Sequence, residues 1–357
     1  MWYTVKKILK VLAVLITVAI IVAVVLAGYL LVNVDSFGKN SHQNVIKSVM
    51  IKIPKGSSTS KVAEILKSNK IIDNTLIFQL ISKIKGYDGK YLKGTYNIDW
   101  NKSYYEVMYI LTHPQALTKF MIPEYMNIYQ LQDRLINADF LNAKSFIDKS
   151  NKVKCNFRFA KGIPSDRKPR YEGYLFPATY NFPKYYTMEE ITKILLETFN
   201  KRYTPFMYAK AKKIGLSTDE VVTLASIVER ETGNPIEYRK IAGVFMNRLK
   251  VKMKLQSDAT INYYLDTLKE LKRNIILKKI SKKELGFTAI HTPYNTYLHS
   301  ALPPGPICSP SIAAIIAVLN YEKHDFYYFY AKRNAAKTSA FSKTYYDHQQ
   351  AIKQFQR

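Results

Sequence analysis

Two glutamates within one strongly apolar segment are the clearest candidates for acid–base chemistry in this chain. Residues 216–232 read LSTDEVVTLASIVERET, in which Ser217 and Glu220 form a capping box that predicts the start of a helix. At about 100° per residue, Glu229 and Glu231 both fall among apolar side chains of that helix. Burial raises the pKa of a carboxyl, which makes it a usable general acid near neutral pH. The pattern does not choose between the two glutamates, and a structural ion pair with an arginine is the alternative for either.

Three further segments carry side chains suited to sugar rings and sugar hydroxyl groups. Residues 171–177 (YEGYLFP) surround a glutamate with aromatic residues, and residues 255–260 (LQSDAT) cluster short polar side chains. Residues 294–297 (YNTY) precede the proline-rich run 302–306 (LPPGP). Tyrosine combines an apolar ring with a polar edge, which suits sugar rings and their hydroxyl groups, while turn chemistry and core packing are the alternatives. The candidate substrate-binding residues are Gln256, Ser257, Asp258, Tyr294, Asn295, Thr296, Tyr297 and Glu172.

The helices and strands predicted along the chain, which must position these side chains, indicate an α+β protein. The length of 357 residues suggests about two domains with appendages. Residues 49–56 predict a short strand that ends in a Pro/Gly turn, and the serines and threonine after it can cap a helix. The small βααβ module predicted over 49–115 contains strands 49–56 and 91–98, helices 61–69 and 74–85, and a following helix 103–112. Residues 116–357 form a larger domain.

An uncharged apolar run at residues 11–32 predicts a single transmembrane helix. The run reaches the roughly 20 residues that a helix needs to cross a bilayer, and three lysines precede it within residues 1–10. By the positive-inside rule, residues 1–10 are expected in the cytoplasm, residues 33–48 form a linker, and the body lies outside. A cleaved signal peptide is the alternative, although its apolar region is usually about 7–15 residues long. We therefore expect a retained anchor in a bacterial plasma membrane.

The chain is strongly basic, with 54 Lys and Arg against 27 Asp and Glu and a formal net charge of +27. Such a charge attracts anionic partners. A body outside the cytoplasm meets anionic lipids and wall polymers, so nucleic acid is not an expected partner. Cys155 and Cys308 are too few for a disulfide scaffold, and whether they pair is open. No Cys/His cluster occurs in the sequence, so no metal site is expected.

Seven segments, in this order, resemble the YceG-like family of endolytic murein transglycosylases. They are EGYLFPATY (172–180), LASIVERET (224–232), FMNRL (245–249), LQSDAT (255–260), YNTY (294–297), LPPGPI (302–307) and FSKTYYDH (341–348). The resemblance covers essentially the whole chain. It implies one N-terminal membrane helix, a small LysM-like βααβ module at 49–115 and a larger α+β catalytic domain at 116–357.

The resemblance also implies a reaction. Members of the family cleave the β-1,4 bond between N-acetylmuramic acid and N-acetylglucosamine inside peptidoglycan strands. The C6 hydroxyl of the muramic acid attacks its own anomeric carbon and leaves a 1,6-anhydro end. The family's catalytic glutamate falls on Glu229, which would protonate the glycosidic oxygen and then accept the C6 hydroxyl proton. One carboxylate then suffices, whereas most glycosidases need two.

The partners implied by the resemblance are peptidoglycan strands, the membrane, peptidoglycan synthases and the elongation or division machinery. No metal or organic cofactor is implied. The chain departs from the usual family pattern at Ala178 (an acid), Ala259 (proline), Ala301 (glycine), Ser309 and Ser311 (an Asn-Pro-Gly segment) and Ser339 (a histidine). These departures leave the cleft geometry and the substrate preference open.

Three functions compete on these grounds. The first is a membrane-anchored lytic transglycosylase that terminates or trims nascent strands, for which Glu229 is essential. The second is a non-catalytic peptidoglycan-binding scaffold, whose binding would be indifferent to Glu229. The third is a muramidase, a true hydrolase, which would leave reducing ends in place of anhydro ends.

Overall fold

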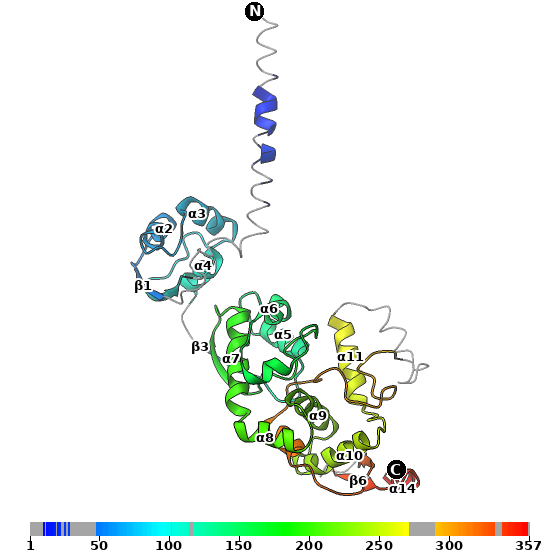
Figure 1. Ribbon diagram of the computed structural model, residues 1–357. Coiled ribbons are helices and arrows are strands. Elements are labelled where there is room, and N and C mark those ends of the chain that lie inside the picture. Colours follow the sequence, from blue (N-terminus) through cyan, green and yellow to red (C-terminus); the bar gives the residue numbers. More distant parts are fainter. Residues whose placement is uncertain are drawn as a thin grey trace, which may run out of the picture. The chain divides into compact units, whose positions relative to one another are not determined.

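The computed structural model describes residues 10, 12–18, 20–22, 25, 28, 48–100, 102–113, 117–270, 290–332 and 338–355. The chain divides into two compact units, Met1–Ala116 and Leu117–Arg357 (Figure 1). Helices and strands occur in both units. The α+β class expected from the sequence is therefore confirmed.

The expected membrane span at 11–32 lies only partly within the described residues. Residues 12–18, 20–22, 25 and 28 are helical and exposed, and the rest of the span lies outside the described residues, as does the linker up to residue 47. None of the helices in the described ranges is long and apolar enough to cross a membrane.

The first unit follows the expected order of strand, two helices, strand and helix. Its elements are β1 (Ser48–Ile53), α2 (Thr59–Ser68), α3 (Thr75–Ile84), β2 (Gly94–Asp99) and α4 (Tyr104–Thr112). The two strands pair antiparallel, with Ile51 opposite Tyr96. Alternate residues of β1 are buried, and Ser58 caps α2 by accepting a hydrogen bond from the Lys61 N–H. The period of two in the strand and the side-chain cap on the helix explain the local structure.

The second unit is mainly helical and holds, within its described residues, two antiparallel sheets of two strands each. Its strands are β3 (Leu117–Met121), β4 (Thr179–Pro183), β5 (Tyr328–Ala331) and β6 (Ser339–Ser342); β3 pairs with β4, and β5 with β6. Its helices are α5 (Ile128–Asn137), α6 (Phe146–Lys152), α7 (Met188–Arg202), α8 (Pro205–Lys213), α9 (Thr218–Glu231), α10 (Tyr238–Lys250), α11 (Asp258–Glu270), α13 (Ile312–Leu319) and α14 (Tyr345–Phe355). Among its described residues are also three short 3₁₀ helices, η1 (Ala143–Ser145), η2 (Arg158–Gly162) and η3 (Pro235–Glu237).

Helix α9 is the centre of the second unit. It packs against α8, α10, α11, α13 and η2, and Figure 1 shows it among α8, α10 and α11. Every residue from Val221 to Glu229 is buried. A helix that is apolar on nearly all sides belongs in the core of a domain. The two candidate glutamates therefore lie at the end of a helix that is packed in the core of the unit.

Candidate active site

The start of α9 is set by the predicted capping box. The Ser217 hydroxyl accepts a hydrogen bond from the Glu220 N–H, and the Glu220 carboxylate accepts one from the Ser217 N–H. This reciprocal pair satisfies two N–H groups that a helix start otherwise leaves without a partner. The cap therefore fixes the residue at which α9 begins.

Glu229 is only 1% exposed, and both of its carboxylate oxygens are bound within the protein. Oε2 accepts hydrogen bonds from the N–H and the hydroxyl of Ser311, both at 2.7 Å, and Oε1 accepts one from the Tyr238 hydroxyl at 3.0 Å. Ser311 caps α13, and Tyr238 is the first residue of α10. Burial raises the pKa of Glu229, while these hydrogen bonds oppose the rise. Glu229 therefore joins α9 to the starts of two neighbouring helices.

Glu231, two residues on, has different surroundings. It is partly exposed and lines a cavity of about 430 Å³. Its Oε1 accepts a short hydrogen bond from the Ser257 hydroxyl. Burial raises the pKa of Glu231 to about 7; the Ser257 hydrogen bond and the Arg248 cation lower it, and the Asp258 carboxylate raises it. A carboxyl that exchanges its proton near neutral pH therefore lies at the wall of an open cavity.

Aromatic side chains form much of this cavity. Tyr328 of β5 stacks on His348 of α14 with ring centroids 5.3 Å apart, and Tyr345 lies 5.8 Å from Tyr328. Aromatic faces combined with a few polar groups are typical of a ligand site that binds an amphipathic ring. The residues that line the cavity are Glu231, Arg248, Leu255, Gln256, Asp258, Tyr297, Tyr328, Phe329, Tyr330, Ala331, Tyr345 and His348.

Arg248 of α10 supplies a buried cation to the same cavity. Its Nε donates to the carbonyl oxygen of Tyr327 at 2.6 Å, and its Nη1 donates to that of Leu255 at 2.7 Å. The guanidinium lies 5.3 Å from the centroid of the Tyr328 ring. Burial lowers the pKa of Arg248, and the neighbouring Tyr328 and Glu231 raise it. These carbonyl contacts hold the charge in a fixed position beside Glu231.

Comparison with known proteins decides the family, because the model of the YceG-like family matches residues 51–354. The chain belongs to the YceG-like family. It is 32% identical over 339 residues to a Bacillus subtilis protein named endolytic murein transglycosylase, with 89% of each chain covered. It is 33% identical over 311 residues to a Streptococcus pneumoniae protein of the same name, which covers 81% of this chain and 55% of that protein.

A solved structure supports the same fold. The crystal structure of a putative YceG-like protein from Listeria monocytogenes matches with a TM-score of 0.54 and 26% sequence identity. The match covers 85% of this chain and 98% of that chain.

Two of the YceG-like segments meet behind the cavity. The Gln256 N–H donates to the carbonyl oxygen of Thr296 at 3.1 Å, and the Ser257 N–H donates to the Thr296 hydroxyl at 2.9 Å. The Tyr297 hydroxyl donates a short hydrogen bond to the Asp258 carboxylate. Gln256, Asp258 and Tyr297 line the cavity, whereas Ser257 and Thr296 are buried beside it. The two segments therefore form one wall, which the sequence could not show.

Glu172 lies apart from the residues that line the cavity around Glu231. It is 1% exposed; its Oε2 accepts from the Ile128 N–H at 3.0 Å and its Oε1 from the Gly173 N–H at 3.2 Å. Burial raises its pKa to about 7, and the two backbone hydrogen bonds oppose the rise. Glu172 does not line the cavity around Glu231. Its contacts fix the start of α5, and its contact with a substrate stays a prediction.

Tyr294 and Asn295 also lie outside the cavity lining. The Asn295 side chain is fully buried and donates to the carbonyl oxygen of Ile290 at 2.7 Å. The Tyr294 ring lies 5.1 Å from that of Tyr263. These contacts shape the turn that carries Tyr297 to the cavity, and so they give Tyr294 and Asn295 a role in loop geometry.

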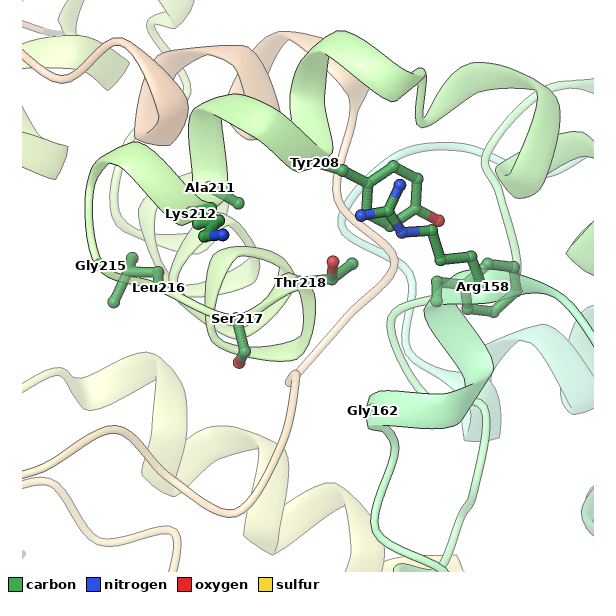
Figure 2. Close-up of a pocket in the computed structure, with 10 residues that line it drawn as sticks. Arg158, Gly162, Tyr208, Ala211, Lys212, Gly215, Leu216, Ser217 and Thr218 are labelled. Carbon is green, nitrogen blue, oxygen red and sulfur yellow. The ribbon is translucent and has the colours of Figure 1, made fainter.

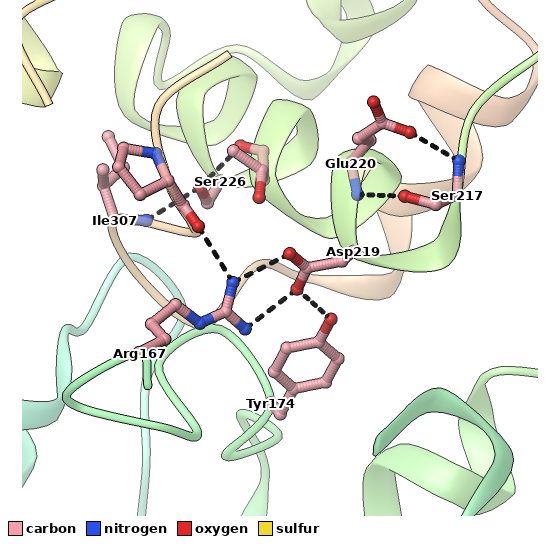
Figure 3. A network of polar contacts seen from close by, with 9 residues as sticks. Arg167, Tyr174, Ser217, Asp219, Glu220, Ser226 and Ile307 are labelled. Carbon is pink, nitrogen blue, oxygen red and sulfur yellow. Dashed lines mark hydrogen bonds and ion pairs between the residues drawn. The ribbon is translucent and has the colours of Figure 1, made fainter. Parts of the chain in front are cut away.

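A buried ion pair connects a loop to the start of α9. Arg167 Nη1 and Nη2 donate to the two carboxylate oxygens of Asp219 at 2.8 and 2.9 Å, and the Tyr174 hydroxyl donates to Asp219 Oδ1 at 2.6 Å (Figure 3). Nη1 also donates to the carbonyl oxygen of Pro304 at 3.3 Å. A bidentate pair of this kind fixes orientation as well as distance.

The proline-rich segment then follows α9 towards its C-terminal end. A Cβ on Gly305 would lie 2.6 Å from Arg167 Nη1, so a larger residue there would displace the guanidinium. Further along, the Ile307 N–H donates to the Ser226 hydroxyl at 3.0 Å (Figure 3). The segment continues to Ser311, which bonds Glu229. The proline-rich segment is therefore packed along the core helix.

Some site residues were not expected from the sequence. Tyr328, Tyr345 and His348 line the cavity, and none of them was among the candidate substrate-binding residues. Tyr345 and His348 belong to the segment 341–348 that resembles the family, so this resemblance could have indicated them as site residues. Within the described ranges, no group of three His, Cys, Asp or Glu side chains could hold a metal ion. Cys155 and Cys308 are free thiols.

Proposed function

We propose that this chain is a lytic transglycosylase that cleaves the β-1,4 bond between N-acetylmuramic acid and N-acetylglucosamine within peptidoglycan strands. The observation that carries the proposal is the carboxyl of Glu231, whose pKa is about 7, in a cavity with aromatic walls. Relatives at 32–33% identity are named endolytic murein transglycosylase, which supports the substrate and the reaction class.

In the proposed reaction, one carboxyl acts twice. The protonated form donates its proton to the glycosidic oxygen while the bond from that oxygen to the anomeric carbon breaks. The resulting carboxylate then accepts the proton of the muramyl C6 hydroxyl as that oxygen bonds to the anomeric carbon. The products are a free 4-hydroxyl and a 1,6-anhydro end, and the carboxyl is protonated again. No water is consumed, because the attacking hydroxyl is already part of the substrate and profits from proximity.

We propose Glu231 as this acid–base group in preference to Glu229. The family motif favours Glu229, which stays a prediction. The geometry favours Glu231, since its carboxyl faces the cavity and bonds one hydroxyl, whereas both oxygens of Glu229 are bound by Ser311 and Tyr238. A group that transfers protons has to come within hydrogen-bond reach of the substrate. Glu229, in this proposal, keeps α10 and α13 docked on α9.

Two matched variants separate these roles. The full chain, Glu231→Gln and Glu229→Gln are incubated with peptidoglycan strands, and the products are analysed by mass spectrometry. We expect Glu231→Gln to lose at least about a hundredfold in anhydro-product release without a fall in thermal stability. Glu229→Gln is expected to lower the melting temperature and to retain activity at temperatures where it is folded. The reverse pattern would return the acid–base role to Glu229.

The same product analysis distinguishes a transglycosylase from a hydrolase. Asp258 lies in the cavity with Glu231 and gives the site a second carboxylate, as a muramidase needs. Reducing ends in place of anhydro ends would establish that alternative. Retained strand binding without any product, for the parent chain in a membrane and with a partner synthase supplied, would indicate the non-catalytic scaffold.

We further propose that residues 11–32 anchor the chain in the plasma membrane, with the body outside the cytoplasm. The uncharged run and the preceding lysines support this. The proposal extends to a LysM-like role for residues 49–115 and to peptidoglycan synthases and the elongation or division machinery as partners. Extraction of membranes at alkaline pH tests the anchor, because an integral protein stays in the membrane fraction. Co-purification from cross-linked cells tests the partners.

A further inference from the structure

A second cavity lies at the opposite end of α9 from Glu231. It has a volume of about 450 Å³ and is formed by η2, the end of α8 and the start of α9. Figure 2 shows Arg158 and Tyr208 on one side, Lys212 and Gly215 on the other, and Thr218 between them. With a rise of 1.5 Å per residue, the length of α9 separates this cavity from Glu231 by roughly 20 Å. It is therefore distinct from the proposed active site.

The charge of this cavity is entirely positive. Arg158 and Lys212 line it, and none of the described residues that line it is acidic. Neither cation has a carboxylate within ion-pair distance in the part of the chain that the structure describes. The nearby acids of α9 are engaged elsewhere, since Asp219 pairs with Arg167 and Glu220 bonds the backbone of Ser217. Two cations without a counter-charge favour an anion in the space between them.

The cavity also holds one of these cations in place. The Arg158 guanidinium lies 4.1 Å from the centroid of the Tyr208 ring, which is a close cation–π contact. Buried Phe159 and half-buried Leu216 add apolar surface, and Thr218 adds a hydroxyl group. A fixed guanidinium is suited to the planar, bidentate recognition of a carboxylate or a phosphate. The volume leaves room for the chain or ring that bears the anionic group.

We propose that this cavity is an anion-binding site that holds a carboxylate or phosphate group of a cell-wall polymer. The anion chemistry follows from the cavity itself, whereas the polymer as its source rests on the proposed function. The site would hold a strand away from the reacting bond, so that Glu231 acts within a strand that is already bound. The contact is electrostatic, and salt therefore weakens it.

Binding is measured by fluorescence anisotropy of the full chain at low salt, with two labelled probes. One probe is a hexamer of glutamate, which offers carboxylates, and the other is a linear hexaphosphate. The test variant is Arg158→Ala with Lys212→Ala. The matched control is Lys193→Ala with Lys201→Ala on α7, which removes the same charge from exposed positions outside the cavity.

An exposed charge contact contributes up to about fivefold in affinity, so we expect the test variant to weaken one probe or both by roughly tenfold or more. The control is expected to weaken binding by less than about twofold. The probe that the test variant binds more weakly shows whether the site takes a carboxylate or a phosphate. Equal losses in the two double variants, or no measurable binding by the parent chain, would overturn the proposal.

Catalysis gives an independent readout. In the release of anhydro products from peptidoglycan strands, the Arg158/Lys212 variant is expected to raise KM and to leave kcat nearly unchanged, because the site binds the strand away from the reacting bond. A failure of the proposed function would appear as inactivity of the parent chain, which leaves the binding result intact. A fall in kcat at saturating strand concentration would show that the two cations act on the reaction itself, and that result would also overturn the proposal.

Discussion

Replacement of Glu172 by glutamine is expected to destabilise the folded chain at acidic pH and to stabilise it at alkaline pH. Glu172 is 1% exposed, and its pKa is raised from the usual 4.5 to about 7 by burial. Below pH 4.5 the carboxyl is protonated in both the folded and the unfolded chain. Between pH 4.5 and 7 the unfolded chain releases this proton while the folded chain retains it, so the free energy of unfolding falls. Above pH 7 the carboxyl is ionised in both states, and the whole loss in the free energy of unfolding remains.

The size of this penalty follows from the pKa. At 1.36 kcal/mol for each factor of ten in proton affinity, the rise from 4.5 to about 7 corresponds to about 3 kcal/mol. Glutamine stays neutral and avoids this loss. Its amide nitrogen cannot accept one of the two hydrogen bonds from Ile128 and Gly173, which costs about 1 kcal/mol at every pH. Glu172→Gln is thus expected to be less stable than the parent chain by about 1 kcal/mol at pH 4.5 and more stable by about 2 kcal/mol at pH 8.

Differential scanning calorimetry of the full chain at pH 4.5 and pH 8 checks this prediction. For a unit of this size, 1 kcal/mol moves the melting temperature by roughly 2–4 °C, so the difference between variant and parent should change by roughly 6–12 °C. Glu197→Gln on α7 is the matched control, because Glu197 is exposed. A difference between variant and parent that is the same at both pH values would refute the reasoning.

Three other substitutions test the site and its support. Arg248→Gln removes a cation that lowers the pKa of Glu231. The alkaline limb of the pH profile of kcat/KM should therefore move up by roughly one pH unit. Arg248→Lys should leave the limb in place, and an unmoved limb in Arg248→Gln would contradict the electrostatic role. Arg167→Ala leaves the Asp219 carboxylate unpaired and should lower the free energy of urea unfolding by about 3 kcal/mol; strict additivity with Asp219→Ala in a double-mutant cycle would exclude the coupling. Ser217→Ala removes the cap of α9 and should cost about 1 kcal/mol in the same assay, and an unchanged unfolding midpoint would show that the cap is dispensable.

Local patterns predicted the elements well. The capping box at Ser217 and Glu220 predicted the start of α9, and the strand and helix order of residues 49–115 agrees with β1, α2, α3 and β2. These features depend on residues that are close in sequence, so a short window contains the required information. The family resemblance was likewise carried by short segments, and the match over residues 51–354 confirms it.

Local patterns could not assign the two glutamates. Glu229 and Glu231 are equivalent on a helical wheel, because each falls among apolar residues. Their difference comes from residues far along the chain, since Ser311 and Tyr238 surround one carboxylate and Ser257 and the cavity surround the other. No period in the sequence of α9 contains that information.

The sequence by itself determined the α+β class, the start of the core helix and the membership of the YceG-like family, since each depends on local spacing or on short motifs. Only the tertiary structure decided which polar side chains meet. It brought Gln256, Asp258 and Tyr297 to Glu231 and enclosed Glu172 within the protein. The physical reason is that burial and hydrogen bonding to distant segments, not residue type, set the pKa and the accessibility of a carboxyl.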